Sequence, residues 1–138
     1  MAPLIALVSG FAVSKLFGLP WAESLRGGLA LMFLVTASAH FVPKMRADLI
    51  AMVPPSLPRP DLLVTITGVL EIAGAVGLLI PATAPWAAGC LALLMVAMFP
   101  ANVSAARRKV PFGGRPATPL VPRILEQILF VAAAIAAI

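Results

Sequence analysis

Five long apolar runs, separated by short polar or proline-rich segments, dominate the pattern of the chain. The runs cover approximately residues 3–19, 24–43, 61–80, 84–104 and 120–138. A helix that crosses a bilayer needs about 20 predominantly apolar residues. Each run is therefore predicted to be a membrane-spanning helix, although the first is short and is interrupted by Gly10 and Lys15.

The segments between the runs have patterns of their own. Residues 44–53 mix charged and apolar side chains, which predicts a short helix lying in the membrane interface. Residues 54–60 contain four prolines, which excludes a helix and predicts a stiff, extended link. Residues 81–85 predict a tight turn, and Pro119 or Pro122 is expected near the start of the last helix.

The composition indicates that lipid is the solvent for most of the chain. Of its 138 residues, 62% are hydrophobic and 11% are charged, and the mean hydropathy is +1.07. Ordinary soluble domains carry roughly 45–50% apolar and about 25% charged residues. Because a chain this short cannot bury so much apolar surface in a water-facing fold, we predict a compact all-α transmembrane domain with about five spans.

Lysine and arginine are concentrated in two of the connecting segments. These segments contain Lys44, Arg46, Arg59, Arg107, Arg108, Lys109, Arg115 and Arg123, against Lys15 and Arg26 on the opposite side. Basic loops favour the cytoplasm, so the pattern predicts an inner-membrane protein with a cytoplasmic N-terminus and an external C-terminus. Membrane lipid is the expected partner of these charges. Nucleic acid is not, because no aromatic side chains are interleaved with the basic cluster at 107–109.

A single glutamate, Glu71, lies in the middle of the third apolar run, TGVLEIAGAVGLLIP at 67–81. A charged residue such as Asp at the membrane centre costs about 2.5–3.5 kcal/mol on insertion scales, so Glu71 should face protein or water. On a helical wheel, one face carries small and polar residues and the other bulky branched ones: Thr67, Gly68, Glu71, Gly74 and Ala75 against Ile66, Val69, Ile72, Val76 and Ile80. This division predicts that Glu71 points into the bundle.

Other polar residues are expected near Glu71. His40 lies near the cytoplasmic end of the second run, Asn102 near that of the fourth, and Gln127 near the start of the fifth. The predicted orientation puts these three at one depth, with Glu71 deeper by on the order of 10 Å. Together with Thr67, they predict a polar pocket that binds a ligand and opens toward the cytoplasm.

Structural interpretations of the same residues remain open. Glu71 could be a protonated carboxyl that makes one hydrogen bond between helices, because burial disfavours the charged form. His40 could lie in the interface rather than in a pocket. Asn102 could satisfy backbone groups near Pro100, since a proline inside a helix removes a hydrogen-bond donor.

No catalytic or metal-binding constellation occurs in the sequence. The chain has one histidine, one cysteine and no acidic cluster, which argues against a zinc or di-iron site. It lacks a P-loop and a dinucleotide-binding glycine fingerprint, and no serine or cysteine pairs convincingly with the only histidine. We therefore expect no catalytic residue, no metal and no cofactor of the chain's own, apart from a bound quinone or lipid.

Three segments resemble the DoxX-like family of small polytopic membrane proteins. They are SAHFVP, TGVLEIAGAVGLLIP and FPANV, in this order and spacing. The resemblance covers roughly residues 24–138. Members of that family look like four-helix membrane bundles. The resemblance therefore implies an additional N-terminal hydrophobic helix in residues 1–20 and a DoxX-like core in residues 21–138.

The resemblance leads to two functional hypotheses. In the first, this is a small bacterial-type membrane component of a redox system, an accessory to an oxidoreductase whose electron carrier resides on a partner. It would bind a quinone or lipid-like molecule through Glu71 and His40, with Asn102 at the mouth. In the second, it is a non-catalytic assembly module. It would pack against a partner membrane protein, or against another copy of itself, through the alanine-rich C-terminal segment AAAIAAI.

Overall fold

The computed structural model describes residues 2–138, which form six helices and no β-strand. The helices are α1 (Ala2–Leu16), α2 (Trp21–Ala39), α3 (Pro43–Met52), α4 (Pro60–Leu79), α5 (Ala84–Arg108) and α6 (Leu120–Ala136). The prediction of an all-α protein is confirmed for this part of the chain. Met1, the first residue of the predicted N-terminal segment 1–20, lies outside the described residues.

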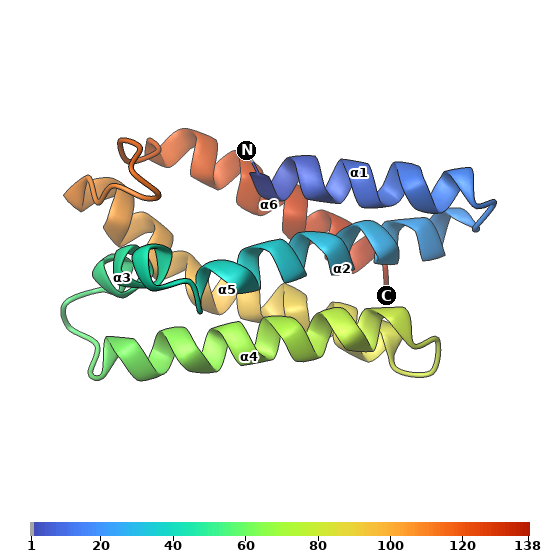
Figure 1. Ribbon diagram of the computed structural model, residues 1–138, viewed down its shortest axis with the longest axis horizontal. Helices are drawn as coiled ribbons and strands as arrows, with labels where there is room; N and C mark the ends of the chain where they lie inside the picture. The colour runs from blue at the N-terminus through green and yellow to red at the C-terminus, as the bar shows by residue number, and fades with distance from the viewer. Residues whose placement is uncertain (1) are drawn as a thin grey trace.

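The long helices lie side by side, and each runs roughly opposite to the long helix before it (Figure 1). α1 packs along α2, and α4 and α5 pack against each other on the other side of α2. The short α3 turns away from α2 by 92°. The helix predicted at 44–53 is thus confirmed as α3, and α6 begins directly after Pro119. The link predicted at 54–60 is non-helical only over 54–59, because Pro60 begins α4, and it is not fully extended, because Leu57 N donates to the carbonyl oxygen of Pro54 at 3.0 Å.

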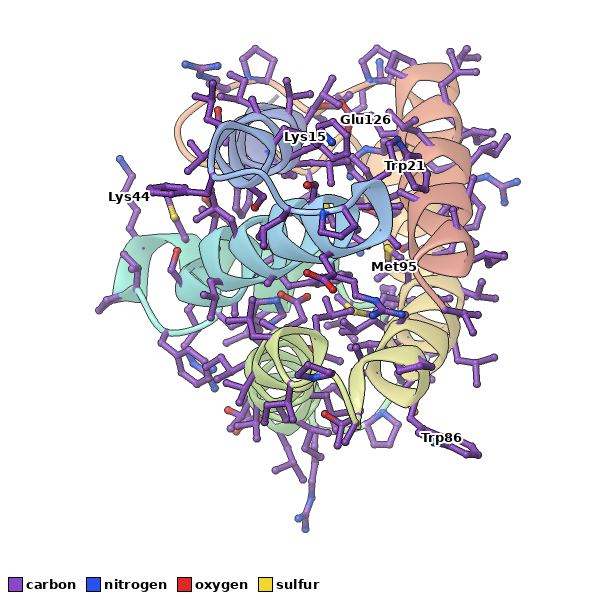
Figure 2. All side chains as sticks on the ribbon, turned by 90° about the vertical axis from the view of Figure 1, so that its right-hand side faces the viewer. Lys15, Trp21, Lys44, Trp86, Met95 and Glu126 are labelled. Carbon is purple, nitrogen blue, oxygen red and sulfur yellow. The ribbon has the colours of Figure 1, made fainter. Side chains whose placement is uncertain are left out.

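The two connections rich in lysine and arginine lie at the same end of the bundle. This end holds α3, the link to α4 and the α5–α6 connection, whereas the short α1–α2 and α4–α5 turns lie at the opposite end (Figure 1). At the opposite end, Trp21 and Trp86 are 56% and 80% exposed, and Trp86 projects away from the bundle (Figure 2). Tryptophan favours the membrane–water interface, so the two ends of the bundle differ in chemical character.

The core lies between α2, α4 and α5, with contributions from α1 and α6. Its largest fully buried side chains include Leu29, Met32 and Leu91, and small residues such as Ala75 and Ala88 let the helices approach closely. The predicted division of α4 into a face of small and polar residues and a face of bulky, branched residues is confirmed. Gly68, Glu71 and Ala75 are buried, whereas the bulky face is exposed at Ile66, Val69, Ile72, Val76 and Ile80.

Glycines set the distance between α1 and α2. A Cβ atom at Gly10 would lie 2.8 Å from the Cα of Gly28, and a Cβ at Gly28 would lie 2.5 Å from the carbonyl oxygen of Leu7. Neither backbone atom can move aside without shifting its helix. The two helices therefore touch backbone to backbone at this point, as small residues allow in membrane bundles.

Two helices, α4 with 20 residues and α5 with 25, are long and apolar enough to cross a membrane. The bent pair of α2 and α3 gives a third if it forms one span. α1 and α6 have 15 and 17 residues. At 1.5 Å per residue, they reach only about 22 and 26 Å, against a hydrocarbon core of roughly 30 Å. Length and composition together thus give two to three spans.

Candidate functional site

The centre of the candidate site is a contact between His40, the residue that caps the C-terminus of α2, and Glu71 in the middle of α4. His40 Nε2 lies 3.4 Å from Glu71 Oε1, and each residue is 4% exposed. Both side chains are therefore enclosed by protein. The prediction that Glu71 points into the bundle is confirmed, and its partner is the only histidine of the chain.

The HFVP sequence explains why His40 faces α4. Pro43 disfavours helical geometry at the preceding residue, and Val42 has φ −79° and ψ 120°. α2 therefore ends at Ala39, and the chain turns sharply into α3, with Pro43 in its first turn. On the α4 side, Gly68 leaves room for the ring, because a Cβ there would lie 2.6 Å from the Cβ of His40.

Hydrogen bonds fix the imidazole ring and the carboxyl group. His40 Nδ1 lies 2.8 Å from the carbonyl oxygen of Val64, and a carbonyl only accepts, so Nδ1 carries a hydrogen. Thr67 Oγ1 lies 3.3 Å from the same nitrogen. Thr36 Oγ1 donates to Glu71 Oε2 at 2.7 Å. In residues 2–138, no buried side-chain nitrogen or oxygen lacks a hydrogen-bond partner.

This geometry requires one proton between His40 and Glu71. Because Nδ1 already donates to Val64, a neutral ring presents Nε2 as an acceptor, which requires a protonated Glu71. A charged ring presents Nε2 as a donor, which matches an ionised Glu71. The two forms differ only in which side chain holds the proton. The pair is therefore suited to hold one proton in an apolar interior and to pass it on.

Two threonines connect the buried pair to the surface of the bundle. Thr36 on α2 and Thr67 on α4 are both partly exposed, whereas His40 and Glu71 are buried. Thr36 precedes His40 by four residues and so lies on the same face of α2. Sequence reasoning did not assign Thr36 to the site, although its spacing of four residues from His40 was a usable signal.

Arg46 on α3 fastens the α2–α3 bend to α4. One guanidinium nitrogen, Nη1, donates to the carbonyl oxygen of His40 at 2.9 Å. The other, Nη2, donates to the carbonyl of Asp61 at 2.9 Å and to Thr65 Oγ1 at 2.8 Å. Sequence reasoning treated Arg46 only as a loop charge, because nothing in the pattern indicates which backbone groups it would meet. Its contacts hold the His40 backbone in place beside α4.

Asn102 and Gln127 make their hydrogen bonds elsewhere, between α5 and α6. Asn102 Oδ1 accepts from Arg123 Nη1 at 3.0 Å, and Gln127 Nε2 donates to the carbonyl oxygen of Met95 at 2.9 Å. Of the residues proposed from the sequence, the structure thus brings His40, Thr67 and Glu71 together. It places Asn102 and Gln127 in a separate helix contact.

Two surface cavities lie at the basic end of the bundle, and neither is lined by His40 or Glu71. One, of about 450 Å³, lies between α5 and the α3–α4 link, and the other, of about 500 Å³, follows the α5–α6 connection. Within residues 2–138, no three His, Cys, Asp or Glu side chains lie close enough together to hold a metal ion.

Fold and site together define a helical protein with apolar helices able to cross a membrane and a buried histidine–glutamate pair. The chain belongs to the family described as Domain of unknown function (DUF8561), whose model matches residues 29–138. The matched range contains every residue of the network around His40 and Glu71. No curated protein and no solved structure matches the chain.

Proposed function

We propose that the protein is a DoxX-like membrane component of a redox system, which binds a quinone or a lipid-like molecule at the His40–Glu71 pair. The observation that supports this proposal best is the pair itself. Two ionisable side chains face each other at 3.4 Å inside an apolar bundle, and each has a threonine hydroxyl within 3.3 Å. Ionisable residues inside a membrane protein are rare and tend to mark ligand or proton pathways.

The proposed membrane arrangement has five spans. α4, α5 and α2 cross with their basic end in the cytoplasm, and α3 lies in the cytoplasmic interface. α1 and α6 also cross, since a bilayer can thin locally around short helices at a modest cost. α2, α4, α5 and α6 then form the four-helix core, and α1 is the addition. The N-terminus is cytoplasmic and the C-terminus external.

The chemistry of the pair suits a quinone head group. A quinone carbonyl accepts hydrogen bonds, and conversion of a quinone into a quinol consumes two electrons and two protons. Whichever of His40 and Glu71 holds the proton of the pair would donate it to the carbonyl oxygen and so supply one of the two protons, and the second would come from water at the cytoplasmic end. The electrons would come from a carrier on a partner protein. Such proton transfer by a positioned side chain is general acid catalysis.

Helix packing alone gives little reason for this particular pair. Two neutral groups could hydrogen-bond α2 to α4 without the desolvation that a buried ionisable pair requires. The ligand would approach the pair along Thr36 and Thr67, which are partly exposed. Occupation by a head group would replace the direct His40–Glu71 contact, which at 3.4 Å is longer than a usual hydrogen bond of about 2.7–3.2 Å.

Native mass spectrometry from a mild detergent tests the proposal with three forms of the protein. These are the wild type, Glu71→Gln and, as a matched control, Glu23→Gln, which makes the same chemical change at an exposed position on α2. We expect an adduct with the mass of a quinone or lipid in the wild type and the control, and its loss in Glu71→Gln. Survival in Glu71→Gln of every small-molecule adduct that the wild type carries, or no small-molecule adduct in the wild type at all, would overturn the proposal.

The assembly hypothesis receives less support from the structure than from the sequence. Ala134 and Ala137 of the alanine-rich segment have no exposed surface within this chain. The carbonyl oxygen of Ala137 also accepts a hydrogen bond from Arg26 Nε at 2.9 Å. These small residues therefore already serve packing inside the protein. A protein adduct of fixed stoichiometry in the same spectra would favour assembly with a partner.

A further inference from the structure

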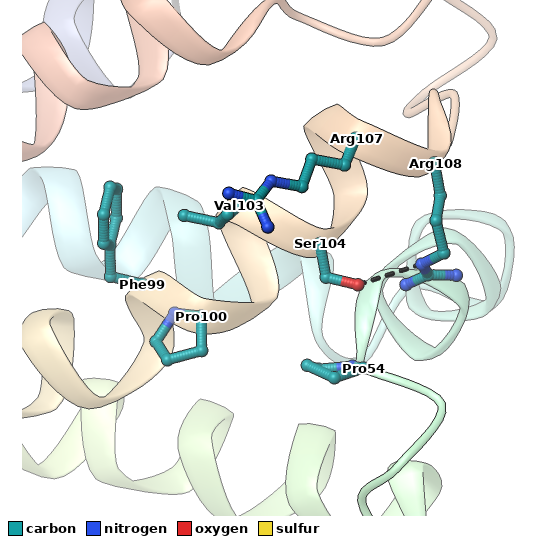
Figure 3. A pocket seen from close by; sticks show the side chains of 7 residues that line it. All are labelled: Pro54, Phe99, Pro100, Val103, Ser104, Arg107 and Arg108. Carbon is teal, nitrogen blue, oxygen red and sulfur yellow. Dashed lines mark hydrogen bonds between the residues drawn. The ribbon is translucent and has the colours of Figure 1, made fainter.

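The cavity of about 450 Å³ at the basic end combines apolar walls with a cationic rim. It is formed by the C-terminal turns of α5 and by the link that follows α3 (Figure 3). Its lining residues are Pro54, Phe99, Pro100, Val103, Ser104, Arg107 and Arg108. The volume falls within the range of roughly 300–1,000 Å³ that is usual for small-molecule sites.

The lining residues of α5 form two rows spaced four residues apart, which places them on one face of the helix. The rows are Phe99–Val103–Arg107 and Pro100–Ser104–Arg108. Along each row the side chains change from apolar in the body of the helix to cationic at its C-terminal end. An anionic phospholipid has the same order of groups, because its hydrocarbon chains are followed by glycerol and then by a phosphate.

The two arginines of the rim have different surroundings. Arg108 donates from Nε to Ser104 Oγ at 2.9 Å, and from Nη2 to the carbonyl oxygens of Met52 and Val53 at 3.0 and 3.2 Å. These bonds hold it against the end of α3. Arg107 has no hydrogen-bond or ion-pair partner within residues 2–138, and its side chain extends along the cavity toward Val103 (Figure 3).

The available donors fit a phosphate group. Arg107 offers an unused guanidinium, which binds phosphate through charge-assisted hydrogen bonds. Ser104 Oγ accepts from Arg108, so its own hydrogen remains available for a second acceptor. Basic pockets on the cytoplasmic side of membrane proteins are known to bind anionic head groups. A soluble phosphate compound would leave the apolar walls at Phe99 and Val103 without a partner.

We propose that this cavity binds the head group of an anionic phospholipid of the cytoplasmic leaflet. Arg107 and Ser104 contact the phosphate oxygens, Arg108 positions Ser104 and adds positive charge, and Phe99 and Val103 pack against the first carbons of the acyl chains. The inference rests on the proposed membrane arrangement but not on the quinone site. Glu71 and His40 do not line this cavity, so the two sites can be tested independently.

The test is a lipid titration of the purified full-length protein in a mild non-ionic detergent, with bound lipids counted by native mass spectrometry. The probes are dioleoyl phosphatidylglycerol and, as the neutral comparison, dioleoyl phosphatidylcholine. We expect preferential binding of the phosphatidylglycerol and a roughly tenfold loss of affinity in Arg107→Gln, because a charge-assisted contact is removed. The matched control Arg115→Gln removes the same charge at the same end outside the cavity. It should lose less than about threefold.

A second variant, Val103→Trp, keeps every charge and fills the apolar part of the cavity. It should weaken phosphatidylglycerol binding as Arg107→Gln does, which separates a built site from attraction to a charged surface. Equal losses in Arg107→Gln and Arg115→Gln, or equal binding of the two lipids, would overturn the proposal. So would full displacement of the lipid by excess inorganic phosphate, because the site would then serve a soluble ligand. Phosphatidylglycerol binding should persist in Glu71→Gln even though that variant loses the adduct at the His40–Glu71 pair.

Discussion

α2 makes two close contacts with its neighbours, and the two are built differently. Against α1, the contact consists of glycines and backbone, with Gly28 beside Gly10 and the carbonyl of Leu7. Against α4, Gly68 makes a similar gap, but the ring of His40 fills it and reaches Glu71. Both contacts depend on a missing side chain. Only the second uses the space for ionisable groups.

The comparison separates packing from chemistry within one bundle. The α1 contact shows that this chain can bring helices together with small residues and no ionisable group, as membrane proteins commonly do. The α4 contact includes a buried acid and a buried base, which are harder to remove from water than apolar groups. Since close packing does not require them, their presence supports a role beyond packing. The variants below test this difference between the two contacts of α2, in order from the largest expected effect to the smallest.

The largest effect is expected from Glu71→Ala. It leaves Nε2 of His40 and the hydroxyl of Thr36 without their buried partner and opens a void beside α2. We expect the free energy of unfolding to fall by about 3 kcal/mol. Thermal unfolding in detergent, followed by circular dichroism, measures the change.

Glu71→Gln is the matched control for this variant. A carboxamide can donate to the Nε2 of a neutral His40 and accept from Thr36, so both contacts survive in neutral form. Its loss of stability should stay below about 1 kcal/mol. Similar large losses in both variants would mean that the charge itself holds α2 and α4 together, and the α4 contact would then be mainly structural.

The next effect concerns the two glycine contacts themselves. Gly28→Ala places a Cβ 2.5 Å from a backbone oxygen, and Gly68→Ala places one 2.6 Å from the Cβ of His40. Each should destabilise the protein by about 1–3 kcal/mol, as overpacking does. Gly89→Ala is the control, because no atom lies within 4 Å of the Cβ that it would add.

The two variants should then differ in function. Gly68→Ala displaces the imidazole ring and should lose the small-molecule adduct, whereas Gly28→Ala should keep it. Native mass spectrometry of both proteins at a temperature where both remain folded decides the question. Retention of the adduct in Gly68→Ala would disconnect the ligand from His40.

Much of the fold followed from apolar runs and prolines. The five long helices occupy the five predicted runs, and HFVP and the four prolines at 54–60 account for the breaks around α3. The buried face of α4 was also predictable, because small and polar residues lie on one side of this helix and bulky residues on the other. Length was harder to predict, because α1 ends at Leu16, just before Gly18 with φ 79° and Pro20, and α6 begins only after Pro119. Apolar composition does not report where the hydrogen-bond ladder ends.

The site could be predicted only in part. The contact of His40 with Glu71 was foreseeable, since each is the unusual polar residue of its run. Asn102 and Gln127 were expected at the same pocket because their depth in the membrane is similar. Their partners, Arg123 and the Met95 carbonyl, lie across the α5–α6 contact. Depth follows from position along a helix, but the neighbour that a side chain meets depends on the rotation of the helix.

A smaller effect is expected from Thr36→Val, which keeps the shape of the side chain and removes its hydroxyl group. Glu71 Oε2 then loses its donor at 2.7 Å. The expected loss is about 1 kcal/mol, the usual net contribution of one hydrogen bond. Thermal unfolding measures it, with Ser38→Ala as the control, because Ser38 is exposed and bonds only within its own helix. An unchanged stability would show that Thr36 is no part of the network.

The smallest change in stability is expected from Thr67→Val. Thr67 Oγ1 donates to the Leu63 carbonyl of its own helix at 2.9 Å, and His40 Nδ1 keeps its shorter bond to Val64 without it. The unfolding free energy should therefore change by less than about 0.5 kcal/mol, since a backbone bond within one helix adds little. A weaker quinone or lipid adduct in this variant, with intact stability, is the result we expect in native mass spectra. It would mark Thr67 as a direct ligand contact, because the α2–α4 contact itself would be undamaged. A full adduct would restrict the polar contacts of the ligand to His40, Glu71 and Thr36.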